Sequence, residues 1–224
     1  YKYLDNIVPY DIDNVRIRYS AQNNAKGYAR GIDLKINGEF VKGLESWASI
    51  SLSQTREDIK GDFYYDYTLD TNKVTNVVRK LDSTRVEPGF IPRPTDQLVT
   101  FAIFFQDQIP QYPNFKVHLN LLYGSGIPFG APGSPKYLQT HRMPSYRRVD
   151  IGFSYQPLKE NREIKPHSPT RYIKSAWISL EVFNLLGINN TVSYLWVEDI
   201  SNRQYAIPNY LTNRQLNLRL IVKF

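Results

Sequence analysis

The segment RQLNLRLIVKF, residues 214–224, alternates apolar and polar side chains. One row consists of Leu216, Leu218, Leu220, Val222 and Phe224, and the other of Gln215, Asn217, Arg219 and Lys223, with Ile221 as the exception. A period of two is the pattern of a β-strand whose faces meet unlike surroundings. A helix would scatter these apolar residues around its axis. The segment therefore predicts a strand with one apolar and one polar face.

Further segments upstream repeat this pattern. Alternation predicts strands over residues 173–184, 146–156, 115–124, 45–56, 27–37 and, more weakly, 13–21, whereas residues 97–106 are apolar on both faces. No segment favours a helix, so the fold class is all-β with about eight antiparallel strands. Several strands run to about 10–11 residues, longer than the usual 5–6. Tilted by about 40°, such a strand rises about 25–28 Å, the height of an outer-membrane apolar band.

The connections between these strands alternate in length. Those near 38–44, 107–114 and 157–172 are short, and those near 57–96, 125–145 and 185–213 are long and rich in Pro, Gly, Asn and Tyr. Long links at one end and short links at the other are typical of transmembrane β-barrels. The link near 22–26 departs from the scheme, because it is short where a long one is expected.

Composition excludes several classes of protein. The chain has 224 residues, and 14% of them are aromatic, which argues against disorder. It has no cysteine, so disulfide scaffolds and thiol enzymes are excluded, and its three histidines are too far apart to predict a metal site. The net charge is +7, but the basic residues are spread along the chain together with acidic ones, which does not favour binding to nucleic acid. No nucleophile elbow, phosphate loop or zinc-protease motif occurs, so we expect no enzyme and no cofactor.

From about Lys26 onward, the chain resembles the C-terminal barrel of TonB-dependent outer-membrane receptors, particularly those of Bacteroidetes-like bacteria. The resemblance rests on short segments in order: GYARGIDL (27–34), RPTDQ (93–97), YGSGIPF (123–129), RRVDI (147–151), EVFNLL (181–186) and the final aromatic Phe224. It implies a bacterial outer-membrane location and active import of a scarce, bulky nutrient: a metal chelate, cobalamin, glycan or peptide.

The resemblance also implies partners. Family members are plugged barrels of the 22-stranded type, whereas about eight strands are predicted here. We therefore expect residues 1–224 to form a single, incomplete barrel domain without a plug, part of something longer that begins before Tyr1. The remaining barrel and plug, in the same or a separate chain, would complete it. The TonB complex would act through the plug, a surface lipoprotein could cover the mouth, and outer-membrane lipid would surround the wall.

Three long links supply candidate ligand-binding residues. Aromatic and basic side chains of this kind can grip a ligand at the mouth of a barrel. The candidates are Tyr64, Tyr65, Tyr67, Tyr137, His141, Arg142, Tyr194 and Trp196. The acidic residues of 57–70 leave calcium open, although the Gly and terminal Glu of an EF-hand are missing, and no metal site is predicted. The segment 192–197 alternates and suggests a short strand within the last link.

The polar faces of the strands supply a second group of candidates. Trp177 and Glu181 share a predicted lumen face, as do Arg148 and Asp150, and all four would face the plug of a complete receptor. Cross-strand ion pairs are expected among Asp33, Lys35, Arg148 and Asp150.

Two other interpretations stay open. A complete eight-stranded outer-membrane barrel, structural or enzymatic, would require residues 13–21 to pair with 214–224. A soluble all-β binding module, such as a lectin-like sandwich, is disfavoured by the strand length and by Phe224.

Overall fold

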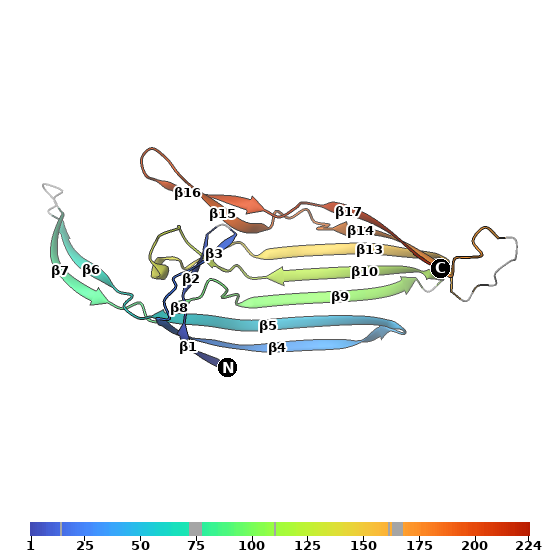
Figure 1. The fold of residues 1–224 in the computed structure, drawn as a ribbon, viewed down its shortest axis with the longest axis horizontal. Coiled ribbons are helices and arrows are strands. Elements are labelled where there is room, and N and C mark those ends of the chain that lie inside the picture. The colour runs from blue at the N-terminus through green and yellow to red at the C-terminus, as the bar shows by residue number, and fades with distance from the viewer. Residues whose placement is uncertain (14, 72–77, 110, 161, 163–167) are drawn as a thin grey trace.

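The computed structural model describes residues 1–13, 15–71, 78–109, 111–160, 162 and 168–224, and the fold is all-β (Figure 1). The strands of the main antiparallel sheet lie side by side in the order β1-β4-β5-β9-β10-β13-β14-β17. Its strands are β1 (Lys2–Ile7), β4 (Ala25–Val41), β5 (Leu44–Ile59), β9 (Val99–Ile109), β10 (Tyr112–Gly124), β13 (Tyr146–Leu158), β14 (Ser175–Phe183) and β17 (Gln215–Lys223). Seven of these eight match predicted strands, and one of the seven is the segment 214–224, which contains β17.

The remaining strands lie outside this path. They are β2 (Tyr10–Asp13), β3 (Arg16–Tyr19), β6 (Tyr64–Thr71), β7 (Val78–Val86), β8 (Ile91–Pro92), β11 (Pro128–Phe129), β12 (His141–Arg142), β15 (Thr191–Glu198) and β16 (Gln204–Tyr210), with a 3₁₀ turn at Lys136–Leu138. β8 pairs with β5, and the others form two-stranded sheets within the long links. The strand suggested within the last link is confirmed as β15.

The prediction of one sheet strand over 13–21 is wrong. Residues 16–19 form β3, which pairs with β2 in a separate hairpin, and the eighth sheet strand is β1. Within the hairpin, Arg18 of β3 forms an ion pair with Asp13 of β2, and opposite charges on neighbouring strands favour local pairing. All four residues of β3 are exposed.

This correction explains the short link near 22–26. Because β1 precedes β4 in the sheet, their connection is residues 8–24, which is a long link at the same end as the others. Figure 1 shows these hairpins gathered at the left of the sheet and the short links at the right. Residues 8–24 thus join the other long links at one end, whereas at the other end the β4–β5 and β9–β10 turns are short and the β13–β14 link, residues 159–174, is nearly as long as 8–24.

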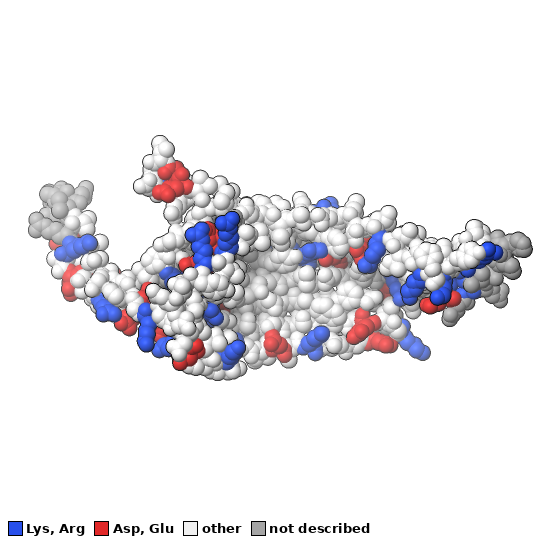
Figure 2. Space-filling view, in the orientation of Figure 1, with Lys and Arg blue, Asp and Glu red and all other residues white. Residues whose placement is uncertain are grey.

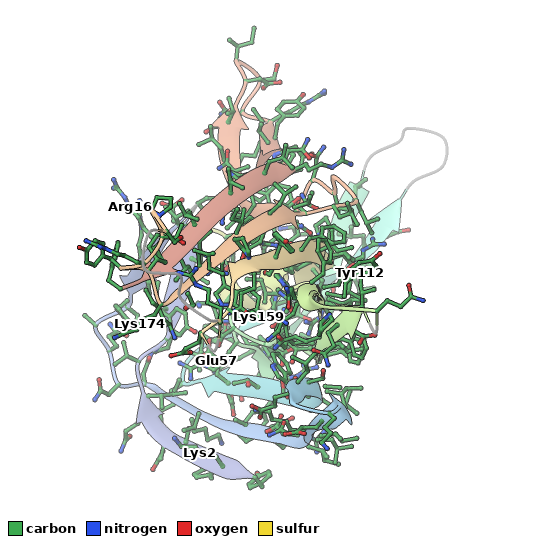
Figure 3. All side chains as sticks on the ribbon, turned by 90° about the vertical axis from the view of Figure 1, so that its right-hand side faces the viewer. Lys2, Arg16, Glu57, Tyr112, Lys159 and Lys174 are labelled. Carbon is green, nitrogen blue, oxygen red and sulfur yellow. The ribbon has the colours of Figure 1, made fainter. Side chains whose placement is uncertain are left out.

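The sheet path ends at β1 and β17, and within the described residues these two strands do not pair with each other. The pairing of 13–21 with 214–224 that an eight-stranded closure requires is not formed, because β3 pairs with β2. Viewed from the short-link end, the sheet is curved and open (Figure 3).

The two faces of the sheet have opposite character. Apolar residues continue across neighbouring strands: Leu119 lies opposite Phe105 on one side and Ile151 on the other. Many residues of this face are exposed, including Ile32, Leu34, Ile36, Ile50, Leu52, Ile178, Leu180, Leu216, Leu218 and Leu220. In the described residues, the buried hydrophobic side chains are only Ala25, Leu44, Ile91 and Ala176. An exposed apolar face of this extent is unusual for a monomeric protein in water.

The opposite face is polar and partly buried. One row runs across five strands through Gln106, His118, Gly152, Glu181 and Asn217. Glu181 is only 8% exposed on this face, whereas Leu218 on the apolar face is 72% exposed. The usual inside-outside distribution of residues is therefore inverted.

Gly152 gives a test of how closely this polar row packs. A Cβ at Gly152 would lie 2.1 Å from Cε1 of His118, which reaches across it to Glu181, with Nε2 3.7 Å from Oε1. Gly152→Ala therefore forces His118 away, and we expect the free energy of unfolding to fall by about 1–3 kcal/mol. Gly38→Ala is the matched control, because a Cβ there meets nothing within 4 Å. Equal denaturant midpoints for the two variants would contradict this packing.

Candidate ligand-binding site

An aromatic cluster lies in the long links, centred on Phe129. Its ring stacks on Tyr194, with centroids 4.6 Å apart and planes inclined by 15°. Trp196 and His141 also lie against it, at 6.3 and 6.2 Å between centroids. The cluster joins β11, β12 and β15, so three of the predicted ligand-binding residues come together around a residue that was not among them.

A second aromatic pair lies at the base of the β6–β7 hairpin. Tyr64 stacks on Tyr137 of the 3₁₀ turn, with ring centroids 4.7 Å apart. Tyr65 and Tyr67 lie along the same hairpin, 6.5 Å apart and 50% and 42% exposed. Figure 1 shows this hairpin projecting away from the sheet. Tyr64 and Tyr137 thus meet, whereas Tyr65 and Tyr67 lie further along the projection.

Arg142, another predicted ligand-binding residue, is engaged within the protein. Its guanidinium pairs with the carboxylate of Asp96 and donates to the carbonyl oxygen of Gly126 at 2.9 Å and to that of Asp96 at 2.8 Å. Asp96 is fully buried and also accepts from the backbone N–H of Thr55 at 2.6 Å. The pair therefore joins the start of the 125–145 link to β5.

A neighbouring charge network fastens the β2–β3 hairpin to the same links. Lys136 Nζ lies 3.0 Å from Asp11 of β2 and 3.8 Å from Glu57, and it also donates to the carbonyl of Tyr10. Glu57 is fully buried, and Arg93 Nε lies 3.0 Å from its Oε2. Four segments distant in sequence meet at this point.

Burial raises the pKa of the Glu57 carboxyl, against the attraction of Lys136 and Arg93, which lowers it. A carboxyl whose pKa is higher in the folded state than in the unfolded state binds its proton more tightly when folded. The free energy of unfolding therefore falls as the pH rises above 4.5 through the folded-state value.

Glu57→Gln carries no titrating group, so we expect this variant to lose that part of the pH dependence. It should gain stability over the native chain as the pH rises from 4.5 to 8. Denaturant unfolding across that interval measures the difference. Glu87→Gln is the control, because Glu87 is 72% exposed. A constant difference between Glu57→Gln and the native chain at all pH values would contradict the assignment.

A small cavity separates the aromatic cluster from the charge network. Its walls include Ile12 of the hairpin, Pro92, Phe129, Lys136 and Trp196. Its free volume is about 40 Å³, enough for only a few water molecules. The described arrangement is therefore closed to a bulky ligand, and a ligand at this point requires the links to move apart.

The four residues predicted to face a plug lie on the polar side of the sheet, where most of them contact neighbouring residues of the sheet. Glu181 accepts from Asn217 at 2.8 Å and from Arg219 at 3.1 Å. Arg148 Nε donates to Asp150 at 2.7 Å. Lys116 lies 5.0 Å from the ring centroid of Trp177. Contact with a plug remains a prediction.

The predicted cross-strand ion pairs are corrected. Arg148 and Asp150 pair two residues apart on one strand, β13. Asp33 instead accepts from the hydroxyl of Ser51, and Lys35 lies over the ring of Trp47. The residues across from Asp33 and Lys35 on β5 are Ser51 and Ser49, so no opposite charge stands across from them.

Over the described ranges, no group of three or more His, Asp or Glu side chains is arranged to hold a metal ion. The acidic residues of 57–70 are dispersed instead: Glu57 faces Arg93, and Asp58 lies 3.3 Å from Lys26. No helix in the described part of the chain is long and apolar enough to cross a membrane.

The sequence analysis did not single out Phe129, Asp96 or Lys136 as site residues. Phe129 and Asp96 fall within quoted segments, YGSGIPF and RPTDQ, where only the order of residues was used. For Lys136, the available signal was its position between Pro135 and Tyr137 in a loop. The partners are distant in sequence, so nothing local pointed to burial.

No protein-family model matches the chain. No curated protein and no solved structure matches it either. The functional interpretation therefore rests on the geometry of the sheet and its links.

Proposed function

We propose that the chain forms part of the wall of a bacterial outer-membrane β-barrel of the TonB-dependent receptor class, which imports a scarce, bulky nutrient. The single observation that supports this most strongly is the inverted sheet: aliphatic residues such as Leu34 and Leu218 are exposed, and polar residues such as Glu181 are buried. Lipid covers such a face at no hydrophobic cost, whereas water does not.

The arrangement of the links supports an orientation. All four long links, including 8–24, lie at one end of the sheet, and the short links lie at the other. Outer-membrane barrels place long links outside the cell and short turns in the periplasm. In this proposal, the aromatic cluster around Phe129 lies at the outer mouth, where a nutrient is first met.

The open sheet supports a shared barrel. β1 and β17 each leave one edge unpaired within the described residues, and an exposed edge pairs readily with further strands. The remaining strands and a plug, from the same or a separate chain, would complete the wall. Energy from the TonB complex would reach the ligand through that plug, and a surface lipoprotein would close the mouth.

Electrophoresis of unboiled and boiled samples from membranes, probed for this segment, tests the proposal. We expect a heat-sensitive folded species much larger than this chain, because a receptor barrel stays folded in cold detergent. A heat-sensitive species of this size alone would instead indicate a complete small barrel, and active import would then be the wrong function. Recovery without detergent in the aqueous fraction would indicate a soluble binding module.

A further inference from the structure

At the short-link end of the sheet, the segment 168–174 presents basic residues. Arg162 holds this loop: its guanidinium donates to Oγ1 of Thr170 at 3.0 Å, to the carbonyl of Thr170 at 2.6 Å and to that of Ile173 at 2.8 Å. The backbone N–H of Arg171 donates to the carbonyl of Ser168 at 3.1 Å. These bonds fix the backbone of 168–173, although Pro169, Arg171 and Tyr172 are exposed.

Arg171, Tyr172 and Lys174 are exposed in this segment, as are Pro169 and, at the start of the same link, Lys159 and Glu160. Tyr172 is 68% exposed. The guanidinium of Arg171 lies 4.5 Å from the ring centroid of Tyr172 and also donates to its hydroxyl. Within the described residues, neither Arg171 nor Lys174 forms an ion pair, so both positive charges are uncompensated there.

These residues lie at the edge of the exposed apolar face. The N–H of Lys174 donates to the carbonyl of Lys223 at 2.7 Å, and the ladder pairs Ser175 with Lys223. Lys174 itself lies at a bend just before β14, beside the end of β17, where Phe224 is 76% exposed. Lys223 falls on the polar face. Figure 2 shows basic side chains gathered at this end, and Figure 3 labels Lys174 there.

We propose that Arg171, Tyr172 and Lys174 form a binding site for the phosphate of an anionic phospholipid in the leaflet that faces the short links. The inference rests on the proposed membrane location of the sheet. Basic side chains at a membrane surface attract anionic lipids, and the guanidinium fork of Arg suits a phosphate. Tyrosine favours the boundary between hydrocarbon and water. Phe224 and the aliphatic row beside Lys174 would lie against the acyl chains of the same lipid.

The test uses the intact protein that contains this chain, purified from membranes and placed in phosphatidylcholine vesicles. Spin-labelled phosphatidylglycerol and spin-labelled phosphatidylcholine report which lipid is held at the protein surface. We expect phosphatidylglycerol to be preferred, and the preference to fall about fivefold in Arg171→Gln or Lys174→Gln. Added salt should weaken it as well. Lys223→Gln is the matched control, since it removes the same charge from the same end but on the polar face, and it should change nothing.

The outcomes separate this inference from the proposed function. If neither labelled lipid is immobilised, the sheet does not face lipid, and the membrane proposal fails with everything built on it. If both lipids are immobilised without preference, or if Lys174→Gln and Lys223→Gln act alike, only the lipid site is overturned. The site is also overturned if Arg171→Gln leaves lipid preference unchanged but lowers binding to purified peptidoglycan, because the basic loop would then bind an anionic polymer.

Discussion

Leu218→Arg is expected to lower the free energy of unfolding in a lipid bilayer by about 2–4 kcal/mol, the cost of a charged side chain near the midplane of a barrel wall. Leu218 lies in the middle of β17, opposite Leu180 of β14, and it is 72% exposed on the apolar face. If lipid covers this face, the guanidinium must leave water or distort the membrane around it. Denaturant unfolding in phospholipid vesicles measures the loss.

Asn217→Arg is the matched control, one residue away on the same strand but on the other face. Asn217 donates to Glu181 at 2.8 Å, so an arginine there meets a carboxylate, and we expect a change of less than about 1 kcal/mol. Equal losses for Leu218→Arg and Asn217→Arg would remove the distinction between the two faces and, with it, the barrel proposal. In a soluble protein, both substitutions would be mild because both sites would face water.

Arg142→Ala should be the most destabilising change in the long links, with an expected loss of about 3–5 kcal/mol. Asp96 is fully buried, and its carboxylate pairs with Arg142. Removal of the guanidinium leaves a buried charge without its cation and leaves the carbonyl of Gly126 without that donor. Thermal or denaturant unfolding measures the effect.

A second variant identifies the cause of that loss. Asp96→Asn in the Arg142→Ala background removes the stranded charge and should restore part of the stability, because the penalty comes from the unpaired carboxylate. Arg85→Ala is the surface control: Arg85 and Glu87 are 53% and 72% exposed, and such pairs contribute about 0–1 kcal/mol. A loss below about 1 kcal/mol for Arg142→Ala would show that the pair does not hold the links.

Arg142 also shows why a loop residue is difficult to interpret from sequence. An arginine beside a histidine in a long, proline-rich link has the chemistry of a ligand contact, and the sequence analysis treated it so. In the structure, its donors are bound by Asp96 and Gly126, residues 46 and 16 positions away. Any ligand contact by this side chain must compete with these bonds.

The prediction of a sheet strand over 13–21 was wrong for a related reason. Val15, Ile17 and Tyr19 alternate as a sheet strand would, and all three are exposed in the structure. Alternation indicates that a strand has two unlike faces, but it does not indicate which strand lies beside it. Asp13 lies close in sequence to Arg18 and forms an ion pair with it, whereas β1 pairs with β4 at the edge of the main sheet.

The sequence by itself determined seven of the eight strands along the main sheet, all but β1, and the character of their faces. That information is local, because side chains two residues apart on a strand share a face regardless of the rest of the chain. The alternation in 214–224 therefore predicts a strand and its two faces without reference to any tertiary contact.

Only the tertiary structure decided which residues of the long links meet. Phe129 stacks on Tyr194, 65 positions later, and Glu57 is buried against Lys136, 79 positions later. Such contacts depend on the order of strands in the sheet and on the path of each link, and no period in the sequence encodes either. The physical reason is that strand faces follow from backbone geometry within a few residues, whereas a site in the links follows from packing between segments that the sheet brings together.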